Sequence, residues 1–286
     1  MGAVIEFKNV NYTYPLTDEP VIKDMNFTIE KGKFYGVIGE NGSGKTTLCA
    51  LVRGFAPDFY KGELEGQVLI NGKPTVEYGT GELSLQIGYV FQNPFNQISG
   101  VKDTVFEEVA FGLENFGVPV DEIEKRVLDV MEMTNIMELA EKKPFELSGG
   151  QMQRVALASV IVLKPDILVI DEPTSQLDPE GTESIFKIIE TMKQEKKTVI
   201  LVEHKIDLIA EYADEVLVLE NGKLIRKGPT AKVLSDISLE DHGVQLPQMA
   251  ILGNKLIESG VKLPYIPITE EQACKVINDV ISKGDK

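Results

Sequence analysis

Hydrophobic and polar positions alternate along the first thirty residues, which is typical of strands with one buried face. The alternation is visible in Val4-Ile5-Glu6-Phe7 and again in Met25-Asn26-Phe27-Thr28-Ile29. A buried strand is predicted at residues 34–38, followed by a glycine-rich turn that opens a helix near Gly44. Two further strands are predicted, at residues 66–70 and 87–91.

The spacing becomes helical between residues 104 and about 163, where one face of a predicted helix is apolar. That face carries Ile123, Val127, Val130 and Met131. Residues 167–170 and 198–202 are instead continuously apolar, as in strands at the centre of a parallel sheet. An Asn221-Gly222 turn then joins two strands of a hairpin, at 215–219 and 223–226.

After Pro229 the pattern changes to short helices and loops marked by proline. Thr269 and Gln272 have the spacing of a helix capping box. The apolar stripe of that helix consists of Ala273, Val276, Ile277, Val280 and Ile281. We therefore predict a separate extension at residues 229–286.

The composition is that of a globular protein, with 286 residues of which 43% are hydrophobic and 26% charged. The longest apolar run, residues 155–163, is shorter than the roughly 18 residues that span a bilayer. The N-terminus lacks the basic and apolar regions of a signal peptide. Any role at a membrane is therefore expected to be peripheral, through a partner.

A formal net charge of −16 disfavours binding to nucleic acid or to anionic lipid. Only two cysteines occur, Cys49 and Cys274, so neither a disulfide framework nor a zinc site is indicated. A reducing cytoplasm is the expected compartment. We expect Cys49 to be a small core residue and His242 to lie on the surface.

The segment between the strand at 34–38 and the next helix has the Walker A pattern. Its glycines let the backbone curve around phosphates with N–H groups pointing inward, and the helix adds its positive dipole end. Its lysine reaches the β- and γ-phosphates and its first threonine ligates Mg²⁺. A glycine-rich loop that merely turns is the alternative, but the flanking strand and helix favour phosphate binding. The predicted nucleotide-binding residues are Gly39, Glu40, Asn41, Gly42, Ser43, Gly44, Lys45, Thr46 and Thr47.

Two acids, Asp171 and Glu172, follow the buried strand at 167–170. They emerge at its carboxyl end, where α/β sheets bind ligands. Asp171 is predicted to hold Mg²⁺ through its water shell, and Glu172 to orient or deprotonate the attacking water. Solvated loop charge would be the simpler interpretation of such a pair alone, but the Walker A pattern favours catalysis.

Leu147-Ser148-Gly149-Gly150-Gln151 precedes a strongly helical segment, and such a helix start is a good anion site. This pentapeptide is the signature of ABC ATPases, which the chain resembles from about residue 4 to residue 228. The resemblance implies that Ser148, Gly149, Gly150 and Gln151 contact ATP. It also implies an α/β fold, with a P-loop NTPase core, an antiparallel β subdomain and a helical subdomain at about 95–165.

The resemblance assigns roles to further residues. Gln92 corresponds to the Q-loop glutamine, which contacts the metal and the water. His204 corresponds to the switch histidine, and the alternative is a hydrogen-bonded residue at a strand end. Tyr14 matches the aromatic residue that stacks on adenine, with Tyr12 as a second candidate. The predicted catalytic residues are Glu172, His204, Gln92 and Lys45, and the predicted metal site consists of Thr46, Gln92 and Asp171.

Within the family, residues 91–97 look like the FQNP-x-x-Q segment of energy-coupling factor (ECF) transporter ATPases, which include cobalt and nickel importers. Gln-Arg-Val-Ala at 153–156 and the helical extension agree with that subgroup. One departure lies in the D-loop, residues 175–178, where Gln176 stands in place of the small residue of many relatives. Because that loop crosses the dimer interface in the family, Gln176 alters the expected contacts there.

The resemblance thus implies an ATPase of the translocase class (EC 7), with ATP and Mg²⁺ as cofactors. It would power import of a vitamin or a transition-metal ion from the cytoplasmic face of the membrane. Two such subunits, identical or paralogous, would sandwich two ATP molecules head to tail. Membrane partners would be a substrate-capture subunit and a transmembrane coupling subunit, and no nucleic acid is expected. Glu107 and Glu108 are candidates to pair with arginines of the coupling subunit, or they form a solvated helix face. Residues 1–228 would form the ATPase domain.

Three alternatives differ from this interpretation. The first is the ATPase of an ABC importer outside the ECF group. The second is a soluble ABC ATPase acting on chromosomes, DNA repair or ribosomes, which the single motif set, the acidic charge and the lack of sustained heptads disfavour. The third is a nucleotide-binding switch that does not hydrolyse ATP, against which Glu172 and His204 argue.

Overall fold

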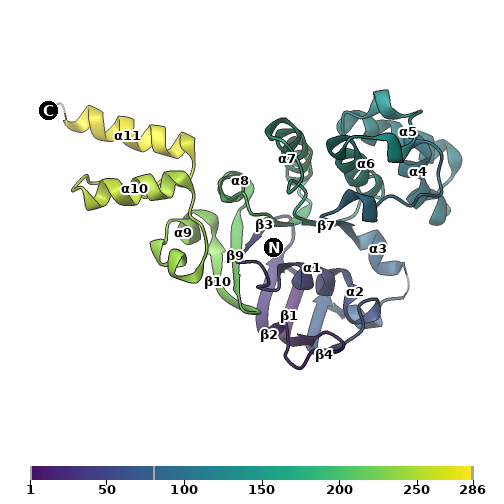
Figure 1. Cartoon of the computed structure of the whole chain (residues 1–286), viewed down its shortest axis with the longest axis horizontal. Helices are drawn as coiled ribbons and strands as arrows, with labels where there is room; N and C mark the ends of the chain where they lie inside the picture. The colour runs from purple at the N-terminus through teal and green to yellow at the C-terminus, as the bar shows by residue number, and fades with distance from the viewer. Residues whose placement is uncertain (1, 80, 285–286) are drawn as a thin grey trace.

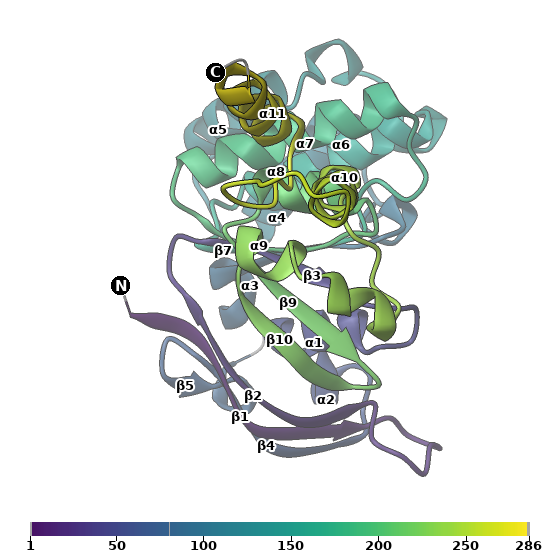
Figure 2. The same ribbon diagram turned by 90° about the vertical axis from the view of Figure 1, so that its left-hand side faces the viewer.

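The computed structural model describes residues 2–79 and 81–284 and contains two sheets. The smaller sheet is antiparallel, has the strand order β2-β1-β4-β5 and lies at the bottom of Figure 2. Its strands are β1 (Ala3–Thr13), β2 (Ile22–Glu30), β4 (Glu63–Ile70) and β5 (Lys73–Pro74). The strands predicted in this part of the chain are confirmed.

The larger sheet has the order β10-β9-β3-β8-β7-β6, and only β10 runs antiparallel to its neighbour. Its strands are β3 (Phe34–Ile38), β6 (Ile87–Val90), β7 (Ile167–Asp171), β8 (Thr198–Val202), β9 (Glu215–Glu220) and β10 (Lys223–Pro229). The hairpin prediction is confirmed, since β9 and β10 pair across Asn221-Gly222. A parallel sheet with this order brings the ends of β3, β7 and β8 to one edge.

Two hydrophobic cores, one on each face of the larger sheet, explain why the first four residues of β7 are all apolar. Ile167 and Val169 belong to the core that also contains residues of α1 (Lys45–Arg53) and of the antiparallel sheet. Leu168 and Ile170 belong to the core formed with the surrounding helices. Since successive side chains of a strand point to opposite faces, both faces must be apolar.

The helical subdomain lies at one end of the molecule (Figure 1). It contains α4 (Val105–Asn115), α5 (Val120–Met133) and α6 (Gly149–Ile161), with short turns at Pro94–Asn96, Met137–Leu139 and Pro144–Glu146. The four apolar residues predicted on one face of α5 are all buried. The remaining core helices and turns are α2 (Phe55–Asp58), Thr75–Glu77, α3 (Glu82–Gln86), α7 (Pro179–Gln194) and α8 (Ile206–Tyr212).

For Glu108, both interpretations that the sequence allowed are wrong, whereas Glu107 lies exposed on α4, as expected for a solvated helix face. Glu107 completes a capping box with Thr104 at the start of α4. Glu108 is 3% exposed and accepts hydrogen bonds from the N–H and the hydroxyl of Ser99, at 2.6 and 2.8 Å. Because the Glu108 carboxylate is buried and accepts two hydrogen bonds, it is neither a solvated charge nor free to pair with an arginine.

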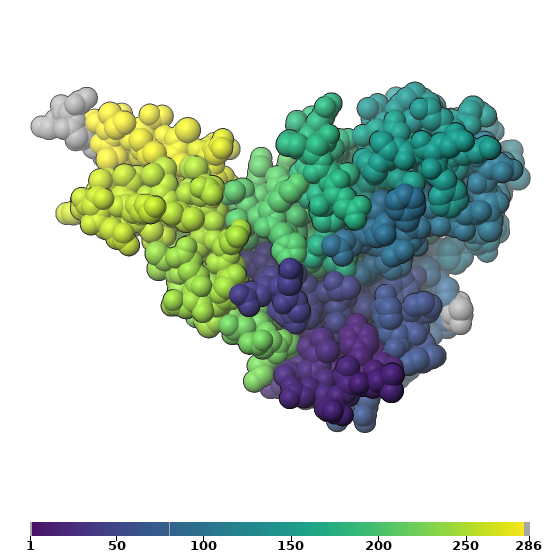
Figure 3. Space-filling model, in the orientation of Figure 1, coloured from purple at the N-terminus to yellow at the C-terminus, as the bar shows by residue number. Residues whose placement is uncertain are grey.

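The extension contains α9 (Thr230–Leu234), the turn Ile237–His242, α10 (Gln248–Glu258) and α11 (Glu270–Gly284). The helices α10 and α11 lie side by side and project away from the body, opposite the helical subdomain. Figure 3 shows the surface hollowed between this pair and α7. The division at residues 228 and 229 stays a prediction.

The first half of the extension shares its core with the ATPase body. Leu239, Val244 and Leu246 are buried in the same hydrophobic cluster as Ile206 and Ile209 of α8. The apolar stripe of α11 is buried only at its beginning, where Ala273 and Val276 are covered, whereas Ile281 is 60% exposed.

The capping box predicted for α11 forms one of its two usual bonds. The N–H of Gln272 donates to the Thr269 hydroxyl at 3.3 Å, as expected. The Gln272 side-chain oxygen accepts from the N–H of Ile268 at 2.9 Å rather than from that of Thr269. The hydrogen bonds that cap α11 therefore reach back to Ile268, one residue before the position that the motif predicts.

The two cysteines and His242 lie in different surroundings. Cys49 is fully buried in the core, as predicted, and Cys274 is exposed. His242 is only partly on the surface, because its Nδ1 lies 3.2 Å from Glu220 Oε1 and its side chain is 35% exposed. Within residues 2–79 and 81–284, every helix is too short or too polar to cross a membrane.

Candidate functional site

The loop between β3 and α1 forms a tight cradle around its own lysine. Lys45 is 5% exposed, and its Nζ donates to the carbonyl oxygens of Gly39 and Glu40 at 2.9 and 3.0 Å. Gly39 has φ near 148°, and a Cβ there would lie 2.1 Å from the Leu219 carbonyl oxygen, so only glycine fits. Burial lowers the pKa of Lys45, while the nearby carboxylates Glu172 and Asp171 act in the opposite direction.

Asp171 lies at the carboxyl end of β7 and is almost entirely buried. Its Oδ2 accepts a hydrogen bond from the Tyr89 hydroxyl at 3.3 Å. Its Oδ1 is buried and has no hydrogen-bond partner among the described residues. Burial raises the pKa of Asp171 and the charge of Glu172 adds to that effect, while the hydroxyls of Thr46 and Tyr89 act in the opposite direction without cancelling it. The ionised carboxylate is therefore costly in the protein alone.

Because the ionised carboxylate of Asp171 is costly to bury, we expect Asp171→Asn to make the nucleotide-free protein more stable. A raised carboxyl pKa means that folding favours the protonated form, so stability is lost as pH rises through the folded-state pKa. At pH 7 we expect the free energy of unfolding to rise by about 1 kcal/mol. Thermal melts without nucleotide or magnesium would measure it, with the exposed Asp166→Asn as control. A lower melting temperature for Asp171→Asn would contradict the argument.

Glu172, the next residue, is shared between two partners from other parts of the sheet edge. Its Oε2 accepts from Gln92 Nε2 at 2.6 Å, and its Oε1 lies 2.9 Å from His204 Nε2. The Glu172 side chain is 13% exposed and that of His204 is 45% exposed. Glu172 has a positive φ of 48°, and its N–H donates to the Val202 carbonyl at 2.9 Å. The strands β6, β7 and β8 thus bring together three of the four residues predicted to be catalytic, beside the lysine cradle.

The two tyrosines that are candidates to stack on adenine, Tyr14 and Tyr12, differ in burial. Tyr12 is fully buried and its hydroxyl bonds to the carbonyl of Lys61. Tyr14 is half-buried, and its hydroxyl lies 3.2 Å from that of Thr47 in α1. Tyr60 packs edge-on against Tyr14, with ring centroids 6.2 Å apart. Of the two candidates, only Tyr14 is accessible to a ligand, and it lies beside the phosphate cradle.

The signature residues lie apart from this cradle in the same chain. Ser148 begins α6, where its hydroxyl accepts from the N–H of Gln151 and its own N–H donates to Gln151 Oε1. Ser148, Gly149 and Gly150 line a pocket of about 390 Å³ together with Gln176 of the D-loop. None of the residues lining that pocket belongs to the Walker A loop. The structure therefore brings the signature to the D-loop, not to the lysine.

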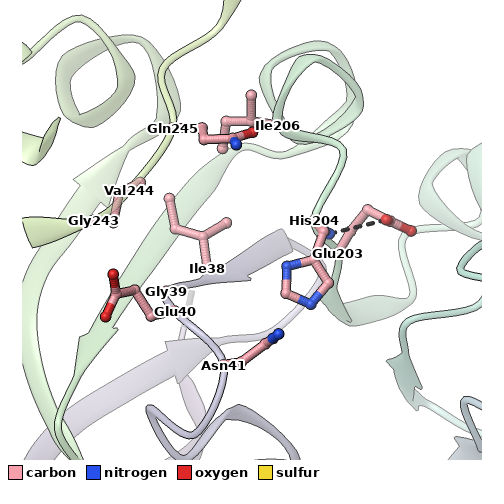
Figure 4. A pocket seen from close by; sticks show the side chains of 10 residues that line it. All are labelled: Ile38, Gly39, Glu40, Asn41, Glu203, His204, Ile206, Gly243, Val244 and Gln245. Atoms are coloured by element: carbon pink, nitrogen blue, oxygen red, sulfur yellow. Dashed lines mark hydrogen bonds between the residues drawn. The ribbon is translucent and has the colours of Figure 1, made fainter.

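A second pocket, of about 460 Å³, opens between the Walker A loop and His204 (Figure 4). Asn41 and His204 face this pocket, and Gly243 of the extension lines its opposite side. A Cβ at position 243 would lie 2.0 Å from Glu40 Oε1, so the extension approaches the phosphate loop closely. Sequence reasoning missed this contact, since nothing in the chain around Gly243 signals it.

Tyr89 was also missed, although it bonds to a predicted metal ligand. It lies on β6, where aromatic residues are ordinary core residues, and burial raises the pKa of its hydroxyl. Its one signal is position, three residues before Gln92. No local motif distinguishes it.

Comparison with known proteins agrees with this geometry. The ABC transporter family profile matches residues 22–175. The energy-coupling factor transporter ATP-binding protein EcfA of Enterococcus faecium is 41% identical over 95% of this chain and 96% of its own length. EcfA1 of Enterococcus faecalis is 40% identical over 95% of each chain.

Two solved structures have the same fold. One is cbiO1 of Clostridium perfringens, part of the ABC transporter complex cbiONQ, with 33% identity, a TM-score of 0.73, and coverage of 88% of this chain and 99% of that one. The other is the dimeric ATP-binding cassette MJ0796 with ADP and Pi in a post-hydrolysis state, with 30% identity, a TM-score of 0.68, and coverage of 79% and 98%. The expected α/β ABC ATPase fold is thus confirmed, and the chain belongs to the ATP-hydrolysing ATP-binding subunits of the ABC transporter family.

Proposed function

We propose that the chain is the energy-coupling ATPase of an ECF-type importer for a vitamin or a transition-metal ion. The observation that carries the proposal is the sharing of Glu172 between Gln92 and His204 beside the lysine cradle. Similarity to EcfA proteins over nearly the whole chain supports the ECF subgroup. The proposed division is an ATPase domain at 1–228 and an extension at 229–286.

In the proposed mechanism, Glu172 accepts a proton from the water that attacks the γ-phosphate. Both of its oxygens are held by donors from neighbouring strands, so its carboxylate is positioned before the substrate arrives. His204 orients Glu172 and contacts the γ-phosphate, and Lys45 balances the phosphate charge. Tyr14 stacks on the adenine, next to the hydroxyl of Thr47.

A magnesium ion fits the residues of the site. Asp171 offers a buried oxygen without a partner among the described residues, and Thr46, the second residue of α1, lies close to its carboxyl group. A hard cation prefers oxygen ligands, and Gln92 adds an amide oxygen. When bound, the ion would neutralise phosphate charge that develops during hydrolysis.

The separation of signature and cradle within one chain supports head-to-tail pairing of two subunits. Each of the two pockets would be completed by the other subunit, so a lone chain lacks part of the charge stabilisation around the γ-phosphate. The relative MJ0796 is described as a dimer. The partner would be a second copy of this chain or a paralogue, and the proposed chemistry is the same in either dimer.

The coupling subunit is proposed to dock beside the Q-loop, on the cytoplasmic face of the membrane. Three large apolar side chains are exposed there: Phe95 (54%), Val101 (69%) and Phe145 (58%). Phe145 lies against Gly100, where a Cβ would come within 3.2 Å of its ring. Exposed apolar side chains of this size are typical of a protein contact. With Glu108 buried, we assign the docking to these residues rather than to ion pairs.

Purification of the tagged chain from its native membrane tests the function. We expect two different membrane proteins, a coupling subunit and a small substrate-capture subunit, and ATP-dependent uptake of one vitamin or metal ion after reconstitution. Recovery of a pair of transmembrane subunits with a soluble binding protein would favour an ABC importer outside the ECF group. Recovery of ribosomes or DNA without membrane protein would overturn a transport role.

A further inference from the structure

A second carboxylate, Glu203, lies directly before the switch histidine but points away from the phosphate site into the protein. It is 4% exposed, although the charged groups of glutamates are seldom buried without partners. Its neighbour His204 is 45% exposed and faces Glu172. The side chains of Glu203 and His204 therefore lie in different environments, the first in the protein interior and the second beside Glu172.

Both oxygens of Glu203 are occupied by donors from two separate loops. Its Oε1 accepts the backbone N–H groups of His204 and Lys205, at 2.9 and 3.2 Å. Its Oε2 accepts the hydroxyl of Thr174 at 2.8 Å. Thr174 is 1% exposed and immediately precedes the D-loop. One buried carboxylate thus joins the backbone of the switch histidine to the start of the D-loop.

Lys205 forms a second connection between the same two regions. Its Nζ donates to the Thr182 hydroxyl at 2.7 Å and lies 3.5 Å from the Thr174 carbonyl oxygen. Thr182 belongs to α7, which begins directly after the D-loop. The D-loop is therefore attached to residues 203–205 on both sides, by the buried pair Thr174 and Glu203 before it and by the exposed Lys205 bonded to the buried Thr182 after it.

The D-loop is also the part of this network that the neighbouring subunit would touch. Gln176 is exposed and lines the signature pocket, whereas Thr174, two residues earlier, is buried against Glu203. A displacement at the surface of the loop would reach Glu203 through the Thr174 hydroxyl, because a buried carboxylate keeps its hydrogen bonds.

We propose that Glu203 is a positioning residue that couples the D-loop to His204, and through it to the base Glu172. This inference rests on the proposed roles of His204 and Glu172. It adds a route by which contact with the second subunit adjusts the orientation of the catalytic carboxylate. Glu203 itself touches neither the substrate nor the reacting atoms.

The histidine count offers a direct test that needs no turnover. The chain has two histidines, so labelled imidazole NMR signals report His204 and His242 separately. In the nucleotide-free full-length protein, Thr174→Val and Glu203→Gln are each expected to shift the His204 signals and to leave those of His242 in place. Thr174→Val removes only the hydroxyl that Glu203 accepts, so its effect must pass through Glu203. When Glu203→Gln is already present, adding Thr174→Val should shift the His204 signals no further.

The matched control is Thr134→Val, which removes another buried hydroxyl, bonded to the Val130 carbonyl at 2.7 Å in the helical subdomain. It should leave the His204 signals unchanged whatever its effect on stability. If Thr174→Val also leaves them unchanged in the folded protein, the coupling is refuted. Equal shifts in the presence and absence of Glu203 would refute it as well.

Kinetics separates positioning from structural support. We expect Glu203→Gln to lower kcat for ATP by roughly tenfold to a hundredfold, since misplacement of a catalytic group has effects of that size, with KM unchanged. A variant that is merely less stable loses active protein but retains normal kcat per folded molecule. Normal kcat in Glu203→Gln would overturn the proposal. Absence of hydrolysis in the wild type would instead count against the proposed function, and the NMR result would still decide the coupling.

Discussion

Glu172→Gln is expected to reduce steady-state ATP hydrolysis by about 10²–10⁴-fold, the range for removal of a general base, while ATP binding is retained. Glutamine has nearly the same shape as glutamate, so it can still bond to Gln92 or His204. It cannot accept a proton from water at neutral pH. Phosphate release measures the turnover, and binding of a fluorescent ATP analogue measures the affinity.

The control for this variant is Glu183→Gln, which makes the same change on the exposed face of α7. Glu183 is paired only with Lys187 at the surface, so its loss should leave hydrolysis at the wild-type rate. Full turnover by Glu172→Gln would remove Glu172 from its role as base. Loss of ATP affinity in that variant would mean that the carboxylate supports binding, not chemistry.

The second large effect is restoration of activity by mixing two inactive variants. Lys45→Ala removes the phosphate-binding ammonium, and Gly150→Asp places a carboxylate on the signature. Each alone should lose about 10²–10³-fold of the activity, as expected for lost electrostatic stabilisation. If each site combines Lys45 of one copy with Gly150 of its neighbour, a mixed dimer has one site with both defects and one intact site. Statistical pairing then predicts roughly a quarter of the wild-type rate.

The choice of Gly150 keeps misfolding from imitating the result. A Cβ there would meet only Leu177 Cδ2, at 3.7 Å, which is ordinary contact, and an acid is favourable in the first turn of a helix. The matched control mixes wild type with the double variant, whose mixed dimers have one defect in each site and should be inactive. Wild-type homodimers then supply roughly a quarter of the rate, against roughly half if each chain completes its own site. No recovery in the first mixture, with mixed dimers demonstrated, would show that each chain completes its own site.

The motifs and central strands were predictable from the sequence because their signals are local. The Walker A loop needs its glycines for its own backbone, as the positive φ of Gly39, Gly42 and Gly44 illustrates. The apolar run of β7 follows from burial on both faces. In each case the residues that cause the structure are neighbours along the chain.

Glu108 and Glu203 illustrate what the sequence could not indicate. Glu108 was expected to be a solvated or ion-paired charge, and no role was predicted for Glu203. Both are buried, and each accepts a hydrogen bond from a serine or a threonine. Thr174 precedes Glu203 by 29 residues, and no periodic pattern connects the two positions. The pair of Thr174 with Glu203 is specified by how β7 and β8 are placed side by side, which is known only after the sheet is assembled.

The shared burial of Leu239, Val244 and Leu246 has a practical consequence for anyone trimming this protein to a minimal ATPase. A truncation at residue 228 would remove these apolar side chains from the core and expose apolar surface beside Ile206, which lies next to Val244. Such a fragment would be prone to aggregate, and its inactivity would say little about catalysis. A cut placed between α10 and α11 removes far less of the common interior.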